Sequence, residues 1–431
     1  MHNIAVYGLW HLGSVTSVCL SSLGFSVTGF DEESVVNELR LGNFPVYEPK
    51  LHELYESSIL TNRLTFEYDL NKLSNAKILW VCFDTPVDDD DVANIDFVIL
   101  KIIDAMYFLE TGSWIVVSSQ VPVGSIGRLK ELQAIKYPDK EFYYSSIPEN
   151  LRLGQAVDIF LNPDRLIVGI DKNTKSTYLI EVLSKINPNI ITVSIESAEL
   201  IKHSINAFLA LSITFINEIS NIAERVGANA GEVSRGLKSE SRIGNKAYLS
   251  PGTSYGGGTL ARDINYLINI SKKIDFKECI FSAIRESNNR HKYWILNTLL
   301  NIFKNNLDGI KVGVLGLSYK PGTNSIRRST SVDLCVKLVS LGANLKIHDP
   351  MADFLPAQLG VKCYSSSEIN VIGGMDVVIL ATEWPQYKTI SKEIFMENKK
   401  IPIIIDPKAF LVQLRGDSRI PYFTIGSINN S

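Results

Sequence analysis

Short apolar runs alternate with longer amphipathic stretches over residues 3–170 of the chain. Five of these runs have the length and composition of buried strands, at residues 3–7, 25–30, 78–83, 114–118 and 166–170. Helical or loop sequence separates them, beginning with a helical stretch from Gly13 to about Leu23. Buried strands that alternate with helices predict a parallel, doubly wound sheet.

A long helical pattern follows this first α/β region. It begins near Ser197, which we expect to cap it, with Glu199 as an acid in its first turn, and it extends to about Val226. Apolar residues cover much of its circumference, namely Ile201, Ile205, Phe208, Leu209, Ile213, Ile216 and Ile219. Such a helix is predicted to be buried between domains or between subunits. We therefore expect a homodimer built across this middle segment.

A second α/β pattern begins at residue 311. It predicts strands at residues 312–315, 345–347, 377–380 and 401–405 and a helix at residues 332–341. The predicted fold class is α/β, with two Rossmann-like doubly wound domains joined by a central helical segment. The three predicted domains are residues 1–196, 197–300 and 301–431, since the chain is too long for one ordinary core.

Composition and charge narrow the class of protein. The chain is 45% hydrophobic and 21% charged, with a formal net charge of −3, so neither nucleic acid nor a membrane is an expected partner. No apolar run approaches the length that crosses a bilayer, and the first residues lack a signal-peptide layout. Three of the five cysteines, Cys19, Cys82 and Cys335, lie in apolar runs and are expected to be buried. We expect a reducing, cytoplasmic setting and no metal site.

A dinucleotide-binding pattern follows the first predicted strand. Gly8, Trp10 and Gly13 occupy the three positions of GxGxxG, and Asp31 ends the second strand. An acid at that point accepts hydrogen bonds from an adenosine ribose and repels a 2′-phosphate, so the predicted cofactor is NAD. Trp10 departs from the pattern, because the middle glycine normally lets the backbone approach the pyrophosphate. The alternative is a Rossmann-type domain that no longer binds nucleotide.

Two further segments carry candidate chemistry. Residues 251–263, PGTSYGGGTLARD, contain three consecutive glycines, which allow close backbone approach to a ligand and leave amide donors for an anion. Lys202 and Asn206 are four residues apart on the long helix and therefore project from one face. A lysine and an amide aimed at one point stabilise an alkoxide or a tetrahedral oxyanion. The alternative is a lysine that extends to solvent and a surface asparagine.

These segments resemble the nucleotide-sugar dehydrogenases of the UDP-glucose 6-dehydrogenase type, the UDP-glucose/GDP-mannose dehydrogenase family. Residues 251–263 resemble its loop GFGGSCFPKD, residues 201–208 its IKxxxNAF helix, and residues 147–152 its NPEFLRE segment. Residues 84–86, 119–125, 241–244, 315–329 and 382–384 resemble its GTP, STVPVGT, DxRIG, LGLAFKxxTDDxRxS and TEW segments. The resemblance extends from Gly8 to about Pro407, which is nearly the whole chain.

The resemblance implies the residues of a site. Those implied to be catalytic are Thr259, Lys202, Asn206, Asp263 and Glu149. The turn and loops implied to bind the cofactor contribute Gly8, Trp10, His11, Leu12, Gly13, Asp31, Thr85, Pro86, Ser119, Gln120 and Arg327. Those implied to bind the substrate are Glu149, Asn150, Leu151, Lys202, Asn206, Arg242, Tyr248, Tyr255, Gly256, Gly257 and Lys320. The implied substrate is a UDP-hexose such as UDP-glucose, and the implied pathway is polysaccharide biosynthesis.

Two positions depart from the family pattern. Thr259 stands where the family has its nucleophilic cysteine, and Leu153 stands where a second glutamate is usual. Without a base, a threonine hydroxyl is a far weaker nucleophile than a thiolate, whereas the first hydride transfer requires only a proton acceptor.

Several interpretations therefore remain. We favour an NAD-dependent nucleotide-sugar 6-dehydrogenase that yields the uronic acid. The alternatives are a two-electron dehydrogenase that stops at the aldehyde or oxidises another hydroxyl, and a non-catalytic paralogue that binds nucleotide sugar or pairs with a true dehydrogenase. A β-hydroxyacid dehydrogenase shares the first domain and a Lys-x-x-x-Asn helix, but that class generally ends in helices rather than in an α/β region.

Overall fold

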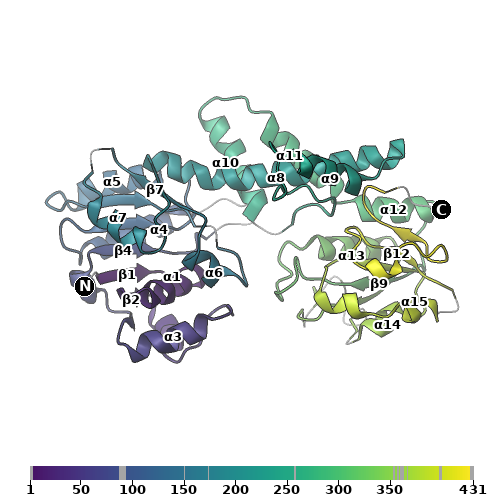
Figure 1. The fold of residues 1–431 in the computed structure, drawn as a ribbon, viewed down its shortest axis with the longest axis horizontal. Helices are drawn as coiled ribbons and strands as arrows, with labels where there is room; N and C mark the ends of the chain where they lie inside the picture. Colours follow the sequence, from purple (N-terminus) through teal and green to yellow (C-terminus); the bar gives the residue numbers. More distant parts are fainter. Residues whose placement is uncertain are drawn as a thin grey trace. The chain divides into compact units, whose positions relative to one another are not determined.

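The structure is a computed structural model of the chain (Figure 1). It describes residues 3–86, 94–149, 151–172, 174–256, 259–352, 355–356, 359, 364–365, 367–397 and 400–427. The chain forms two compact units, Met1–Ile205 and Asn206–Ser431.

The first unit is built on an eight-stranded sheet with the order β3-β2-β1-β4-β5-β6-β7-β8. Its strands are β1 (Asn3–Tyr7), β2 (Ser26–Phe30), β3 (Leu64–Glu67), β4 (Ile78–Val81), β5 (Trp114–Val117), β6 (Tyr143–Ser146), β7 (Leu166–Ile170) and β8 (Ile190–Val193). All neighbouring strands are parallel except β6 and β7, which are antiparallel. Because helices cover both faces, central strands such as β4 and β5 are buried throughout and consist entirely of apolar residues.

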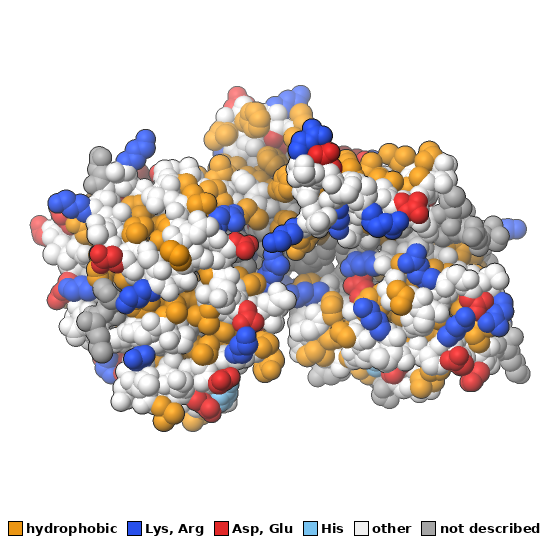
Figure 2. Space-filling model, viewed as in Figure 1, with side chains coloured by type: hydrophobic (Ala, Val, Ile, Leu, Met, Phe, Trp, Pro, Cys, Tyr) orange, Lys and Arg blue, Asp and Glu red, His pale blue; other side chains and the backbone are white. Residues whose placement is uncertain are grey.

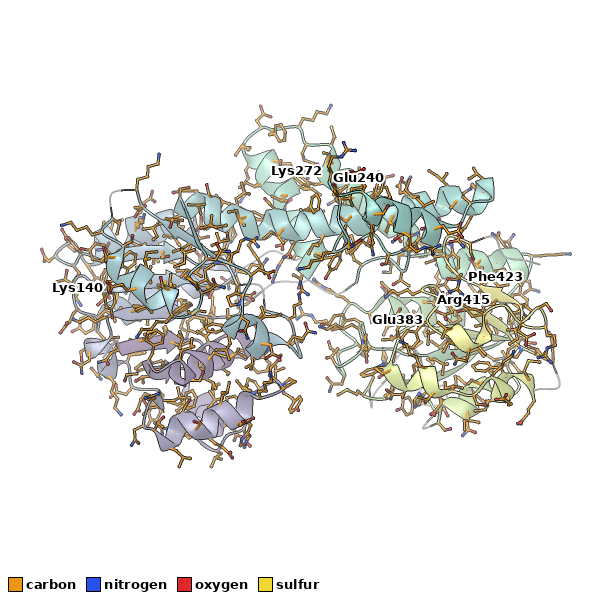
Figure 3. All side chains as sticks on the ribbon, viewed as in Figure 1. Lys140, Glu240, Lys272, Glu383, Arg415 and Phe423 are labelled. Carbon is orange, nitrogen blue, oxygen red and sulfur yellow. The ribbon has the colours of Figure 1, made fainter. Side chains whose placement is uncertain are left out.

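Helices cover both faces of this sheet (Figure 1). One face carries α1 (His11–Ser22), α2 (Glu33–Arg40), α3 (Leu51–Leu60), α6 (Ala156–Leu161) and α7 (Thr177–Ser184). The other carries α4 (Ile95–Met106) and α5 (Ser125–Lys136). Lys140 (Figure 3) donates from Nζ to the carbonyls of Met106, Tyr107 and Leu109, at 3.1, 2.6 and 2.8 Å, and so satisfies the end of α4.

The second unit contains a helical region and a smaller sheet. The helices are α9 (Ala230–Ser239), α10 (Thr259–Lys273), α11 (Ile280–His291) and α12 (Trp294–Ile302). The sheet has the order β10-β9-β11-β12-β13, all parallel, from β9 (Lys311–Leu315), β10 (Asn344–His348), β11 (Val377–Leu380), β12 (Ile403–Ile405) and β13 (Tyr422–Phe423). α12 and α13 (Thr330–Ser340) cover one face, and α14 (Glu368–Ile372) and α15 (Lys392–Met396) cover the other. The predicted fold class is thus confirmed, as is the burial of Cys19, Cys82 and Cys335.

The long helix α8 (Ile195–Val226) begins in the first unit and ends in the second. The expectation that Ser197 caps it is wrong, because the helix starts earlier and Ser194 Oγ accepts a hydrogen bond from Ser197 N at 3.2 Å. The expectation that no segment has a membrane-spanning length is also wrong, since α8 is long and apolar enough by length and composition. Its buried Asn217 nevertheless accepts from Gly252 N at 3.2 Å, as in a helix packed within a protein.

Burial along α8 is uneven within the single chain. Within the chain its buried positions are mainly small or polar, among them Ala207, Ala210 and Ser220. Several large apolar residues are exposed instead, namely Phe208, Leu211, Phe215, Ile222 and Val226. Small side chains let α8 pack closely on one side within the single chain, and burial of its other side between subunits stays a prediction.

Candidate active site

The turn from β1 to α1 requires glycine at two positions. Gly8 has a φ of +92°, and a Cβ there would lie 2.7 Å from the ring of Phe83. A Cβ on Gly13 would lie 1.7 Å from the carbonyl oxygen of Gly8, which no side chain permits. Strand and helix therefore approach closely, and the N-terminus of α1 follows the turn directly, as an anion such as a pyrophosphate requires.

The acid and the tryptophan of this turn have different environments. Asp31, just after β2, accepts from Leu9 N at 2.5 Å and from Glu32 N at 2.7 Å, and it remains partly exposed. Trp10 directly precedes α1, and 51% of its surface is exposed. The indole thus extends to the surface at the position where the sequence pattern expects glycine.

The loops after β4 and β5 lie next to each other. Thr85 Oγ1 donates to the carbonyl of Gln120 at 2.7 Å, and Pro86 is exposed. Ser119 is buried, but no described residue bonds to its Oγ. A buried hydroxyl without a protein partner accommodates a ligand or a water. Together with the glycine turn, this arrangement fits a dinucleotide along the carboxyl ends of the parallel strands.

Two predicted catalytic residues of the first unit form a pair. Lys202 Nζ donates to the carbonyl of Glu149 at 2.6 Å and lies 3.6 Å from its Oε1. Glu149 Oε2 accepts from Leu151 N at 2.6 Å, which fixes the carboxylate. A cavity of about 10 Å³, close to the room for one water, is lined by Ser119, Gln120, Glu149 and Lys202 among others. Residues predicted for the cofactor and for catalysis therefore meet at one cavity.

Two further residues of α8 hold the loop after β5, and neither was predicted from the sequence to do so. Glu199 accepts from Gly124 N at 2.7 Å and from Ile126 N at 3.1 Å, at the start of α5. Burial raises the pKa of Glu199, although these two amides oppose the shift. His203 Nε2 lies 3.2 Å from the carbonyl oxygen of Val121. Their position on the predicted helix could have indicated this role, because Glu199 lies three residues before Lys202 and His203 lies one residue after it.

The second unit places the remaining catalytic candidates near the start of α10. Asn206 Nδ2 donates to Asp263 Oδ2 at 2.5 Å, and both side chains are buried. Thr259 is the first residue of α10, one turn before Asp263, and it is exposed. An exposed hydroxyl at a helix N-terminus is accessible to a ligand, and the helix dipole there favours negative charge.

The predicted substrate residues of the second unit divide into packed and exposed groups. Tyr255 packs in the core of α8, α10 and α11, and burial raises its pKa to about 12. Gly256 is exposed, and a Cβ there would be in ordinary contact with Thr330, at 3.5 Å. Tyr248 is exposed, and Arg242 pairs with Glu240, labelled in Figure 3, at 2.9 Å.

The remaining predicted cofactor and substrate residues lie in both units. Arg327 is exposed, and Lys320 lies 5.7 Å from the centre of the Tyr319 ring. Leu12 packs against the core of the first unit, and His11 contacts Glu48. Asn150 and Gly257 lie outside the described residues. Within the described part of the chain, no group of three or more His, Cys, Asp or Glu residues is placed to hold a metal ion.

Comparison with known proteins gives consistent matches along the chain. Sequence models of the UDP-glucose/GDP-mannose dehydrogenase family match its NAD binding domain at residues 2–187, its central domain at 196–290 and its UDP binding domain at 313–413. The UDP-glucose 6-dehydrogenase TuaD of Bacillus subtilis is 33% identical over 416 residues, covering 94% of this chain and 89% of that protein. The UDP-glucose 6-dehydrogenase of Rickettsia bellii is 30% identical over 437 residues, covering 99% of each.

Comparison with solved structures gives matches over nearly the whole chain as well. A UDP-glucose dehydrogenase from the hyperthermophilic archaeon Pyrobaculum islandicum has a TM-score of 0.86 at 28% identity, covering 99% of this chain and 98% of that one. A UDP-D-ManNAc dehydrogenase from Pyrococcus horikoshii shares the fold, with a TM-score of 0.84 at 20% identity, covering 98% and 99%. The match at residues 313–413 also argues against the β-hydroxyacid dehydrogenase alternative.

Proposed function

Because the chain belongs to the UDP-glucose/GDP-mannose dehydrogenase family, we propose that it is an NAD-dependent nucleotide-sugar 6-dehydrogenase. Its substrate is UDP-glucose or a related UDP-hexose, which it oxidises from the C6 alcohol to the uronic acid for polysaccharide biosynthesis. The observation that carries this proposal is the Lys202–Glu149 pair beside a water-sized cavity that Ser119 and Gln120 also line.

The domain division that accompanies this function has three parts. Residues 1–196 bind NAD, residues 197–300 form the central helical domain, and residues 301–431 bind the UDP group. The match of an NAD binding, a central and a UDP binding domain in this order supports the division. Lys320 and Arg327, which follow β9, suit recognition of a diphosphate.

Residues of the first unit hold the cofactor. Gly8 and Gly13 admit the pyrophosphate, Asp31 accepts from the adenosine ribose, and the buried hydroxyl of Ser119 has capacity for a polar group of the ligand. NAD, when bound, supplies the hydride acceptor for each of the two oxidations. Conversion of the alcohol and one water to the carboxylate releases two hydrides and three protons, and the chain's own groups manage the protons and the water.

Side chains of the predicted catalytic residues carry out this proton chemistry. Lys202 and Asn206 are one turn apart on α8, so we assign both to the same reacting centre. Lys202, with Asp263 bound to Asn206, takes the hydroxyl proton and stabilises the alkoxide. Glu149, adjacent to the water-sized cavity, assists the attack of water.

Thr259 determines how the second oxidation proceeds. Its neutral hydroxyl does not form the thiohemiacetal that a thiolate forms, so the aldehyde reaches the acid through its hydrate, and more slowly. α10, the helix that begins at Thr259, contains no cysteine that could act in its place. The second candidate function, a dehydrogenase that stops at the aldehyde, rests on the same residue.

The exposed face of α8 supports a homodimer. Its exposed apolar residues recur at spacings of three, four and seven and lie on one face, namely Phe208, Leu211, Phe215, Ile222 and Val226. Figure 2 shows apolar side chains at the surface in the region of α8 and α9. Such a stripe is typical of an interface between subunits. Light scattering tests this, since a homodimer has twice the mass of the chain in solution.

We also propose a cytoplasmic location, which is consistent with the free cysteines of the described residues.

The decisive experiment counts NADH per sugar with UDP-glucose and identifies the product by mass. Two NADH and the uronic acid support the proposal, one NADH and the aldehyde support the second candidate, and none supports a non-catalytic paralogue. Thr259→Cys should raise the rate of acid formation, whereas Thr259→Ala should leave it nearly unchanged if the hydrate route operates. Lys202→Ala should lower both oxidations. Loss of acid formation in Thr259→Ala would show that the hydroxyl itself attacks.

A further inference from the structure

A buried carboxylate connects the dinucleotide turn to the loop that follows Glu149. Glu48 lies between α2 and α3, and its side chain is fully buried. Its Oε1 accepts from His11 Nε2 and from Gly154 N, both at 2.8 Å, and its Oε2 accepts from Ala156 N at 3.0 Å. One carboxylate therefore contacts the first residue of α1 and the segment that leads from Glu149 into α6.

The histidine is the element of this link that belongs to the cofactor turn. An ionised carboxylate only accepts hydrogen bonds, so Nε2 of His11 carries the hydrogen. Removing the imidazole leaves Glu48 with its two backbone donors, Gly154 N and Ala156 N, and the loop stays capped. A neighbouring pair, Lys50 Nζ to Asp158 Oδ1 at 2.7 Å, also ties this segment to α6 but does not touch the turn.

Apolar packing and a polar contact both join the segment that leads into α6 to α1. α1 and α6 pack on the same face of the sheet (Figure 1), but a cavity of about 80 Å³ lies beside them. Its lining includes Leu12 from α1, Leu151 from the loop, and Ile159 and Phe160 from α6. Ala156 and Val157, at the start of α6, are buried in the same apolar cluster as α1. The contact from His11 through Glu48 therefore adds a polar link between the turn and a segment whose far end is already packed.

We propose that His11 is a positioning residue that couples the cofactor site to the sugar site. A dinucleotide on the turn restricts His11, and His11 through Glu48 orders residues 151–156 next to Glu149. The second ligand then meets a loop whose ordering is already complete, so each ligand raises the affinity for the other by the same factor. This inference rests on the proposed function, since it takes the two ligands to be a nicotinamide dinucleotide and a nucleotide sugar.

Binding of UDP-glucose with and without saturating NADH tests the coupling. NADH already carries the hydride, so no oxidation occurs during the calorimetric titration. For the wild-type chain we expect NADH to tighten UDP-glucose by roughly fivefold or more, the lower end of usual coupling factors. His11→Ala should bring the factor close to one, and His11→Gln, which keeps an N–H for Glu48, should restore most of it.

A matched control is available on α3. His52 is an exposed histidine 3.5 Å from Glu56, so His52→Ala removes the same chemical group away from the link and should keep the wild-type factor. A wild-type factor of one, or an unchanged factor in His11→Ala, overturns the inference. A purely structural role of His11 would weaken both ligands without changing the factor.

A second measurement separates this inference from the proposed function. If wild-type chain does not bind UDP-glucose, the substrate assignment fails, and amide exchange of residues 151–156 on addition of NADH then decides the link. Protection in the wild type that is absent in His11→Ala supports the link, and equal protection in both overturns it. A wild-type chain that does not bind NADH overturns the link and the cofactor assignment together.

Discussion

In each unit the first strand of the sheet is followed by a glycine of positive φ, and the next strand of the chain is followed by an aspartate. In the first unit these are Gly8, at +92°, and Asp31, and in the second Gly316, at +100°, and Asp349. The glycine amides donate to equivalent carbonyls, of Phe30 at 3.0 Å and of His348 at 2.7 Å. The backbone therefore has the same kind of turn, with the same hydrogen bond, after the first strand of each sheet.

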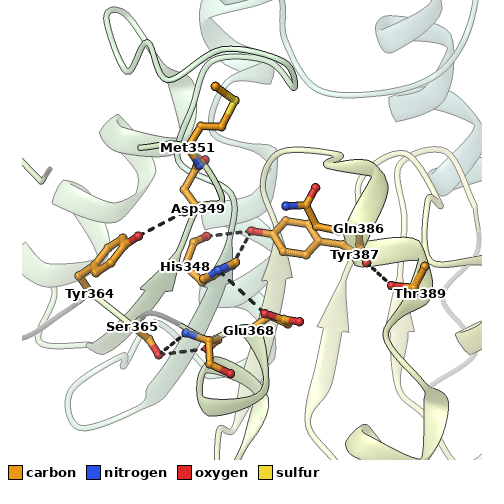
Figure 4. Close-up of polar contacts among 10 residues, drawn as sticks. His348, Asp349, Met351, Tyr364, Ser365, Glu368, Gln386, Tyr387 and Thr389 are labelled. Carbon is orange, nitrogen blue, oxygen red and sulfur yellow. Dashed lines mark hydrogen bonds and ion pairs between the residues drawn. The ribbon is translucent and has the colours of Figure 1, made fainter. Parts of the chain in front are cut away.

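The helix that follows the glycine and the environment of the aspartate differ between the two units. α1 begins at His11, three residues after its glycine, whereas α13 begins at Thr330, fourteen residues after Gly316. Asp349 is buried, and its neighbourhood is drawn in Figure 4. Its donors are Leu317 N, Ser318 N, Ser318 Oγ, Met351 N, Ala352 N and Trp384 Nε1, at 2.7 to 3.2 Å.

Asp31, in contrast, accepts from two backbone amides and stays partly exposed, so it has acceptor capacity for a ligand. Burial opposes ionisation of Asp349, but the amides of Ser318 and Leu317 hold its pKa below the usual value. A glycine and an aspartate at the ends of these two strands thus suit a dinucleotide where the protein leaves the carboxylate incompletely bonded and starts a helix at the turn.

The largest predicted effect is on the stability of the second unit. Asp349→Ala leaves several buried donors without an acceptor, each costing about 1–3 kcal/mol, so we expect a loss of about 3 kcal/mol or more. Asp31→Ala, with two lost bonds in a partly exposed position, should cost about 1 kcal/mol. Urea unfolding followed by amide exchange of β9 and β1 peptides measures each unit. Equal losses in the two variants would contradict the comparison.

The second prediction concerns NADH affinity, for which a change at Asp31 should have a larger effect than a change at Asp349. Asp31→Ala removes a charged acceptor, so NADH should bind roughly tenfold or more weakly, in accord with about 1.5–3 kcal/mol for hydrogen bonds to charged groups. Asp349→Asn keeps the side-chain size and one acceptor and should leave NADH affinity nearly unchanged in the chain that remains folded. Fluorescence titration of NADH gives both values. A Kd for Asp31→Ala equal to that of wild type would show that the carboxylate is structural in both units.

The sequence predicted strands whose residues are almost all apolar. β1, β7 and β11 coincide with predicted runs, because strands covered on both faces need no polar alternation. β3 and β6 were missed, since their sequences LTFE and YYSS are short and partly polar. The antiparallel pairing of β6 with β7 depends on how the chain returns to the sheet, and local pattern does not record this.

The same distinction holds for the site. Spacing alone places Lys202 and Asn206 one turn apart on α8, because four residues complete about one turn. Contacts between distant segments were not visible, such as Glu199 with Gly124 and Glu48 with Gly154, which are 75 and 106 residues apart. Such contacts exist only after the sheet has assembled. Residues that hold two distant segments together are therefore harder to predict from the sequence than residues whose spacing on one helix is fixed.

The third prediction is that acid affects the two units in opposite directions. Burial lowers the pKa of His348 and of His291 in the second unit, although nearby carboxylates such as Glu368 partly oppose this for His348. Below about pH 6.5 the unfolded chain binds more protons than the folded unit, so stability falls as pH decreases towards the folded pKa values. The loss is at most about 1.4 kcal/mol per pH unit for each histidine.

The first unit carries the opposite case in Glu199, whose pKa burial raises. The contribution of Glu199 to the free energy of unfolding is fully present below the pKa of the unfolded chain, near 4.5. It is lost as pH rises through the pKa of the folded unit. Amide exchange of β9 and β1 peptides between pH 7.5 and 5.0 compares the units, with His348→Gln as the variant that should reduce the acid sensitivity of β9. If β9 is equally stable at both pH values, His348 and His291 do not control the unit.

The smallest predicted effect separates the turns themselves. Trp10 and Ser318 both stand two residues after the first glycine, but Trp10 is 51% exposed whereas Ser318 is buried and donates to Asp349. Trp10→Gly lets the backbone approach the pyrophosphate and should tighten NADH a few-fold, since the added flexibility of glycine, about 0.5–1 kcal/mol, offsets part of the gain. Trp10→Ser instead gives the first turn the residue of the second.

The serine variant is the more informative of the two. Its hydroxyl would lie where Ser318 Oγ reaches Asp349 at 3.1 Å, so it should donate to Asp31 and compete with the ribose. We therefore expect Trp10→Ser to bind NADH more weakly than Trp10→Gly, although both remove the indole. Titration of the two variants side by side measures this difference. If they bind equally, internal bonding of the carboxylate does not decide between a cofactor turn and a structural one, and the early start of α1 decides alone.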